Sequence, residues 1–192
     1  MKIRAVIFDM DGTIVDVSYD WQQIKKELNT GGKPILHYLI SLKEPERSEK
    51  WKALEKFEDE ATAKASLKEG MKEFLDFLAE KGVKRALVTN NSNKNVNFLL
   101  RKFNLQFEVI LSRESGLWKP SGSPFEAVLK KLSLKKEEVC VVGDSHFDIE
   151  AAQKAGISIV FILNKNKEKF AHFSVEVFSS VKNLKERIGR LI

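Results

Sequence analysis

The chain has 192 residues, 43% hydrophobic and 31% charged, which is enough for one domain of ordinary size with a hydrophobic core. Its formal net charge is +6, but lysines alternate with glutamates without a block of like charge, so we expect no nucleic-acid surface. A single cysteine excludes a disulfide framework, and no apolar run approaches the ~20 residues that cross a bilayer, so we expect a soluble, cytoplasmic protein.

The first predicted element is a strand at residues 3–8, which are apolar and rich in β-branched side chains. This pattern is typical of a parallel strand that is buried on both faces. Residues 17–66 then contain no convincing strand. Helical segments are expected there at about 18–29, 34–42 and 45–66. We therefore predict a helical insert, a cap domain at 17–66, with hinges near Val15 and Leu67.

Strands and helices alternate in the rest of the chain. Further apolar strands are expected at 85–88, 109–111, 139–142 and 157–162, and helices at 69–81, 93–103, 123–132 and 146–155. A short strand and a helix are expected in the tail from about 174 to 192. The alternation predicts an α/β fold, a doubly wound parallel sheet with helices on both faces, built from residues 1–16 and 67–192.

Polar side chains stand where the predicted strands end, and in an open parallel sheet ligands bind at these carboxyl ends. Asp9 and Asp11 follow the first strand, and Thr89 and Asn90 follow the second. Lys119 comes after the third, and Asp144 and Asp148 follow the fourth. We expect all of these side chains to converge at one edge of the sheet.

Carboxylates gathered at one place repel each other, by a few kcal/mol at ~4 Å and an effective dielectric near 20. A hard divalent cation compensates this repulsion, and oxygen ligands favour Mg²⁺. A threonine hydroxyl and a lysine ammonium would supply the hydrogen-bond donor and the positive charge that a phosphoryl group needs.

The residues Asp9-Met10-Asp11-Gly12-Thr13 resemble the first signature of the haloacid dehalogenase (HAD) superfamily. Thr89, Lys119 and the segment from Gly143 to Asp148 match its second, third and fourth signatures in the same order. The resemblance covers residues 1–163, and it is greatest to phosphoglycolate phosphatase-like members with a helical cap. It implies a Rossmann-like core and a Mg²⁺-dependent phosphatase acting on a small phosphorylated metabolite.

The resemblance also implies roles for these residues. Asp9 would be the nucleophile that forms an aspartyl-phosphate, and Asp11 would be the general acid and base. Asp9, the backbone carbonyl of Asp11 and Asp144 would bind the metal. Asp148 would hold a metal-bound water or orient Lys119.

The same resemblance assigns phosphate binding to three residues. Thr89, with the amide of Asn90, would grip the phosphoryl oxygens. Lys119 would neutralise the charge that develops near the nucleophile. The segment Lys119-Pro120-Ser121-Gly122 departs from the Lys-Pro-Asp-Pro of many relatives, which predicts a longer or looser loop.

Two alternatives remain beside the phosphatase. The acid at Asp11 favours phosphoryl transfer over halide displacement, but it leaves open a phosphomutase of the β-phosphoglucomutase type. A non-catalytic anion- or nucleic-acid-binding module is the other alternative, motivated by the charge of +6. We interpret His146 as a solvated side chain rather than a base, and Cys140 as a small buried hydrophobe.

Overall fold

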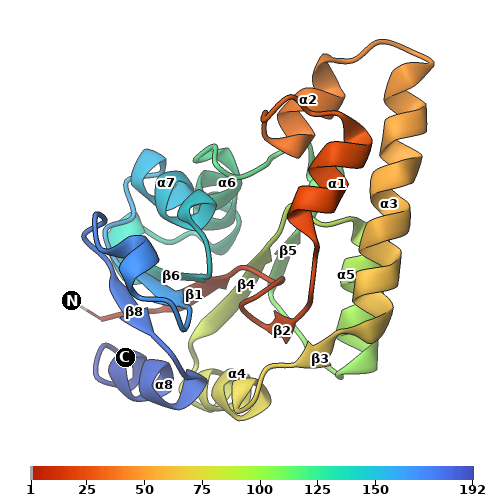
Figure 1. Ribbon diagram of the computed structural model, residues 1–192. Helices are drawn as coiled ribbons and strands as arrows, with labels where there is room; N and C mark the ends of the chain where they lie inside the picture. The colour runs from red at the N-terminus through yellow and green to blue at the C-terminus, as the bar shows by residue number, and fades with distance from the viewer. Residues whose placement is uncertain (1) are drawn as a thin grey trace. The chain divides into compact units, whose positions relative to one another are not determined.

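The computed structural model describes residues 2–192, which form two compact units. The first unit joins the chain up to Asp16 to Ser66–Ile192, and the second is Val17–Ala65. Figure 1 labels the α-helices and most of the strands of the two units. Among the described residues, no helix is both long and apolar enough to span a membrane.

A six-stranded sheet forms the centre of the first unit, and its strand order is β5-β4-β1-β6-β7-β8. Its strands are β1 (Ala5–Phe8), β4 (Lys84–Val88), β5 (Val109–Leu111), β6 (Val139–Gly143), β7 (Val160–Leu163) and β8 (Glu176–Phe178). Every neighbouring pair in this sheet is parallel. The prediction of a doubly wound parallel sheet is confirmed.

The strand order reverses around β1, which lies between β4 and β6. The chain adds β4 and β5 on one side of β1 and then crosses to add β6, β7 and β8 on the other. In open α/β sheets the crevice at such a reversal, outside the carboxyl ends of the strands, is where ligands bind.

Helices cover both faces of this sheet. They are α4 (Met71–Glu80), α5 (Asn93–Lys102), α6 (Ser123–Leu132), α7 (His146–Lys154) and α8 (Val181–Gly189). α6 and α7 pack together on one face of the sheet. α4 packs against α8 on the other face (Figure 1). Phe125 of α6 and Ile149 of α7 belong to the main apolar core with Ile7 and Val141 of the sheet. The apolar stripes read from the sequence are therefore the surfaces that the helices bury.

Shorter elements complete the first unit. The 3₁₀ helices are η1 (Arg113–Ser115), η2 (Lys136–Glu138) and η3 (Glu168–Phe170). An antiparallel ribbon pairs β2 (Val15–Asp16) with β3 (Ser66–Leu67), where we expected hinges, and Lys68 makes an ion pair with Asp16 beside it.

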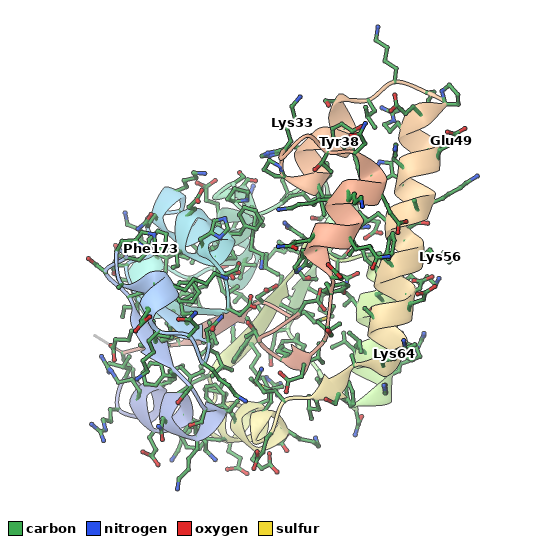
Figure 2. The ribbon with its side chains drawn as sticks, in the orientation of Figure 1. Lys33, Tyr38, Glu49, Lys56, Lys64 and Phe173 are labelled. Atoms are coloured by element: carbon green, nitrogen blue, oxygen red, sulfur yellow. The ribbon has the colours of Figure 1, made fainter. Side chains whose placement is uncertain are left out.

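The second unit, Val17–Ala65, consists of the three helices α1 (Trp21–Leu28), α2 (Ile35–Ser41) and α3 (Glu46–Lys64). Its own apolar cluster contains Ile24, Leu28, Leu39 and Leu54, and Tyr38 packs against it. Figure 2 labels Tyr38 on α2 and the exposed Lys56 and Lys64 on α3. The three helices match the predicted segments to within a few residues.

Candidate active site

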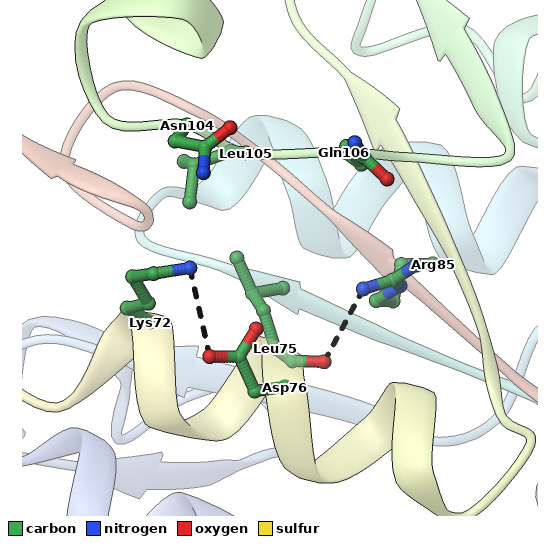
Figure 3. A pocket seen from close by; sticks show the side chains of 7 residues that line it. All are labelled: Lys72, Leu75, Asp76, Arg85, Asn104, Leu105 and Gln106. Carbon is green, nitrogen blue, oxygen red and sulfur yellow. Dashed lines mark hydrogen bonds and ion pairs between the residues drawn. The ribbon is translucent and has the colours of Figure 1, made fainter.

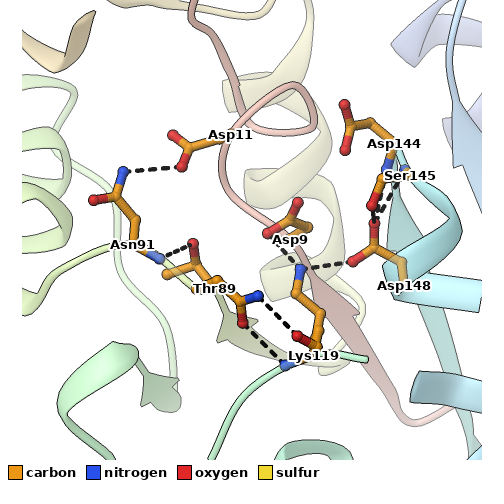
Figure 4. A network of polar contacts seen from close by, with 9 residues as sticks. Asp9, Asp11, Thr89, Asn91, Lys119, Asp144, Ser145 and Asp148 are labelled. Carbon is orange, nitrogen blue, oxygen red and sulfur yellow. Dashed lines mark hydrogen bonds and ion pairs between the residues drawn. The ribbon is translucent and has the colours of Figure 1, made fainter. Parts of the chain in front are cut away.

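The side chains singled out at the strand ends meet in the first unit. Asp9 directly follows β1, and its amide still donates to the carbonyl of Val142 in β6 over 2.9 Å. Thr89 follows β4, and Asp144 follows β6. Figure 4 shows these residues around the ammonium group of Lys119. The edge at which the sheet reverses therefore carries the polar cluster.

Lys119 joins two carboxylates. Its Nζ lies 2.7 Å from Asp9 Oδ1 and 2.6 Å from Asp148 Oδ1, and the residue is only 5% exposed. Burial by itself would lower the pKa of Lys119, but the carboxylates of Asp148 and Asp9 more than offset this and raise the pKa. Lys119 is therefore a fixed positive charge beside Asp9.

Asp148 is fully buried in the first turn of α7. Its Oδ2 accepts hydrogen bonds from the amides of Asp144 (3.3 Å) and Ser145 (3.1 Å) and from the Ser145 hydroxyl (2.8 Å). Ser145 and Asp148 thus form a capping box, which the spacing Ser-x-x-acid in the sequence could have indicated. The carboxylate of Asp148 is occupied by hydrogen-bond donors on both oxygens.

Three carboxylates lie close enough to hold a cation. Asp9, Asp144 and Asp148 each offer an oxygen within 4.8 Å of the others. Burial, reinforced by Asp148, raises the pKa of Asp144 to about 7. Burial also raises the pKa of Asp9, against the opposing charge of Lys119, and Asp148 and Asp144 raise it further. One ammonium group does not neutralise three carboxylates, so this donor set fits a hard divalent cation.

The turn after β1 brings the backbone against Asp144. Gly12 has a φ of +81°, and a Cβ at this position would lie 2.2 Å from Asp144 Oδ2. Gly12 thus lets the turn approach the carboxylate of Asp144, whereas Asp148 already accepts hydrogen bonds on both of its oxygens.

The carboxylate of Asp11 points away from this cluster. Its Oδ2 accepts a hydrogen bond from Asn91 Nδ2 over 2.9 Å (Figure 4). Asn91 is buried, and it is not among the site residues predicted from the sequence. The two residues are 80 positions apart, so no local pattern could have linked them.

Thr89 and Asn90 organise the opposite side of the site. The Thr89 hydroxyl is buried and accepts from the amide of Asn91 over 3.1 Å. The Asn90 side chain donates to the carbonyl of Lys119 and accepts from its amide, each over 2.9 Å. Pro120 is held as well, because its carbonyl accepts from Lys154 Nζ over 2.9 Å. These contacts anchor the backbone of Lys119 and Pro120, in the loop that the sequence predicted to be longer or looser.

The other candidate nucleophile and base lie outside this cluster. Cys140 is buried in β6, and burial raises the pKa of its thiol to about 12. A thiol of this kind is inert at neutral pH. His146 is exposed, and its ring packs at a tilt of 45° against Phe147 with 4.3 Å between the ring centroids. Both residues have the roles that we interpreted from the sequence.

A cavity of about 170 Å³ lies elsewhere in the first unit, beside α4 (Figure 3). Arg85, near the start of β4, lines it, whereas Thr89 follows the end of the same strand. Its charged groups are paired: Lys72 with Asp76 at 3.5 Å, and Arg85 with Glu108 at 2.9 Å. The cavity therefore lacks the gathered acids that define the candidate active site.

The fold and the site define a doubly wound α/β protein with an aspartate-rich cluster at the carboxyl edge of its parallel sheet. The profile of the haloacid dehalogenase-like hydrolase family matches residues 6–162, so the chain belongs to this family. It is 31% identical over 183 residues to a phosphorylated carbohydrates phosphatase of Thermotoga maritima, covering 83% of this chain and 84% of that protein.

The chain is also similar to a further curated protein and, in fold, to a solved structure. A pyrophosphatase PpaX of Halalkalibacterium halodurans is 28% identical over 182 residues, which is 84% of each chain. The crystal structure of a hydrolase from Pseudomonas syringae superposes with a TM-score of 0.82 at 18% identity, over 98% of this chain and 99% of that one. The family, fold and enzyme class expected from the sequence, a HAD-like hydrolase with phosphatase relatives, are confirmed.

Proposed function

We propose that this protein is a Mg²⁺-dependent phosphatase that hydrolyses a small phosphate monoester through an aspartyl-phosphate on Asp9. The observation that supports this most directly is the environment of Asp9. Its carboxylate contacts the buried ammonium of Lys119 at 2.7 Å and lies beside Asp144 at the carboxyl edge of the sheet. A carboxylate in this setting can attack a phosphoryl group whose charge the neighbouring cations offset.

Asp9, the carbonyl of Asp11 and Asp144 would hold the Mg²⁺, and Asp148 would keep Lys119 in place. When bound, Mg²⁺ neutralises charge on the carboxylates and on the phosphoryl oxygens. Thr89 and the amide of Asn90 would bind phosphoryl oxygens from the other side, together with Lys119.

In the first half-reaction a carboxylate oxygen of Asp9 forms a bond to phosphorus, and the bond from phosphorus to the alcohol oxygen breaks. Asp11 donates its proton to the departing oxygen, so that the alcohol leaves neutral. The products are the free alcohol, an aspartyl-phosphate at residue 9 and an ionised Asp11.

In the second half-reaction the ionised Asp11 takes a proton from water. The water oxygen bonds to phosphorus, and the bond from phosphorus to the Asp9 oxygen breaks. This releases inorganic phosphate and restores the Asp9 carboxylate and the protonated Asp11, so the cycle closes without a further reactant.

We further propose that the helical segment 17–66 is a cap that excludes water and contacts the leaving group. The names of the relatives, a phosphatase for phosphorylated carbohydrates and a pyrophosphatase, support a small phosphorylated metabolite as substrate. We also keep the prediction of a cytoplasmic enzyme.

The test is phosphate release from a panel of phosphate monoesters with Mg²⁺, comparing wild type, Asp9→Asn and the control Asp76→Asn. Asp76 is an exposed acid on α4 and serves as the matched control. We expect Asp9→Asn to lose all measurable activity and Asp76→Asn to retain it. Equal activity in all three proteins would exclude Asp9 as the nucleophile, and faster isomerisation than hydrolysis of a sugar phosphate would indicate a phosphomutase.

A further inference from the structure

Asn91 holds the carboxylate to which the proposed function assigns proton transfer. Its Nδ2 donates to Asp11 Oδ2 over 2.9 Å, and Asn91 is only 3% exposed (Figure 4). We propose that Asn91 is a positioning residue, which fixes the carboxyl group of Asp11 for proton delivery to the leaving oxygen. This inference rests on the proposed function.

The orientation of the Asn91 amide follows from its other contacts. Its Oδ1 accepts from the backbone amide of Ser92 over 2.7 Å and from Asn95 Nδ2 over 3.2 Å. A backbone amide can only donate, so the oxygen of the Asn91 side chain must face Ser92. The NH₂ group therefore faces Asp11.

The backbone of Asn91 is held at both ends. Its amide donates to the hydroxyl of Thr89 over 3.1 Å, and its carbonyl accepts from the amide of Arg113 over 3.0 Å. The residue is thus joined to the phosphate-binding strand end and to the segment after β5. Such a fixed donor can define the position of a partner side chain better than a mobile one.

The contact fixes one oxygen of the Asp11 carboxyl group, because Asn91 Nδ2 donates to Oδ2. The position of the second oxygen, Oδ1, follows from this contact. Proton transfer needs the donor and acceptor atoms within about 2.6–3.2 Å, and a displacement of about 1 Å can cost about 10²-fold in rate.

A leaving-group comparison measures this role. An alkoxide leaves poorly unless it is protonated, whereas p-nitrophenolate is a stable anion and needs little help from an acid. The ratio kcat/KM reports the steps up to departure of the alcohol. For Asn91→Leu we expect kcat/KM to fall about 10²-fold with glycerol phosphate but less than about threefold with p-nitrophenyl phosphate.

Three further variants complete the experiment. Asn97→Leu makes the same exchange at an exposed position of α5 and should change neither substrate's kcat/KM. Asn91→Ala removes the donor without placing a second carboxylate beside Asp11, so it should discriminate in the same direction as Asn91→Leu. Circular dichroism establishes which Asn91 variant is folded, and that variant carries the test. Asp11→Asn provides the reference for loss of the acid.

The outcomes are distinct. An equal loss on both substrates in the folded Asn91 variant would show a merely structural role and overturn the inference. If Asp11→Asn discriminates between the substrates and the Asn91 variants do not, the inference fails while the proposed function stands. If Asp11→Asn does not discriminate either, the acid role in the proposed function fails and the inference falls with it.

Discussion

Single residues determine how closely the acids of the site approach the backbone. Gly12 and Gly143 both lie where a methyl group would strike a carboxylate: Asp144 Oδ2 at 2.2 Å in one case and Asp148 Cγ at 2.3 Å in the other. Gly12 also has a positive φ, whereas Gly143 is required only for space. The sequence indicated a turn at Gly12 but could not show what the turn approaches.

We predict that Gly12→Ala disrupts the metal site. The new Cβ meets Asp144 and also occupies a strained backbone conformation, so Mg²⁺-dependent activity should be lost. Gly82→Ala is the matched control, because Gly82 has a φ of +68° and open space around it. Its cost should be limited to about 1–2 kcal/mol of unfolding free energy from the backbone. Urea unfolding and Mg²⁺ titration of activity measure both effects, and similar activity losses in the two variants would contradict the steric argument.

At the scale of elements, the strands and helices of the sheet could be predicted because each has a clear hydrophobic period. The β2–β3 ribbon could not, since two residues in each strand carry no pattern. Because the carboxyl ends of parallel strands meet at one edge of a sheet, the sequence predicted that Asp9, Thr89 and Asp144 lie together at that edge. It could not reveal that the side chain of Asn90 clamps the backbone of Lys119, because that contact depends on two loops meeting in space.

The two hydrogen bonds between the Asn90 side chain and the Lys119 backbone, which we call the clamp, give a further prediction. Asn90→Ala removes both hydrogen bonds from the Asn90 side chain to the backbone of Lys119. It leaves the backbone N–H of residue 90 in place. Lys119 should then shift, and we expect kcat to fall about 10²-fold, as a displacement of about 1 Å in an active site typically causes. Steady-state kinetics on the best substrate of the panel measures this, with Asn97→Ala as the exposed control. Unchanged kcat in Asn90→Ala would show that the loop holds Lys119 without the clamp.

At the scale of the whole molecule, the site concentrates negative charge inside a chain whose formal net charge is +6. The pKa of Asp144 is about 7 in the folded chain, against an ordinary value of 3.8. The folded chain thus binds this proton more tightly than the unfolded chain. Without metal, the stability that this group contributes is present at low pH and is lost as the pH rises from about 4 through 7.

Mg²⁺ and this proton should therefore compete. We predict that saturating Mg²⁺ raises Tm more at pH 8 than at pH 5, because the carboxylates must be ionised to bind the cation. Thermal unfolding with and without Mg²⁺ at the two pH values measures the difference. The variant Asp144→Asn should show a much smaller effect at both. A larger rise at pH 5 would contradict the assignment of Asp144 as a metal ligand.

The most direct measurement is to trap the phosphorylated enzyme. Borohydride reduces an acyl phosphate, so an aspartyl-phosphate formed during turnover should yield homoserine at position 9 in the peptide mass spectrum. We predict homoserine at position 9 only when substrate and Mg²⁺ are both present. Rapid release of phosphate with an unmodified Asp9, or with the modification at another residue, would contradict it.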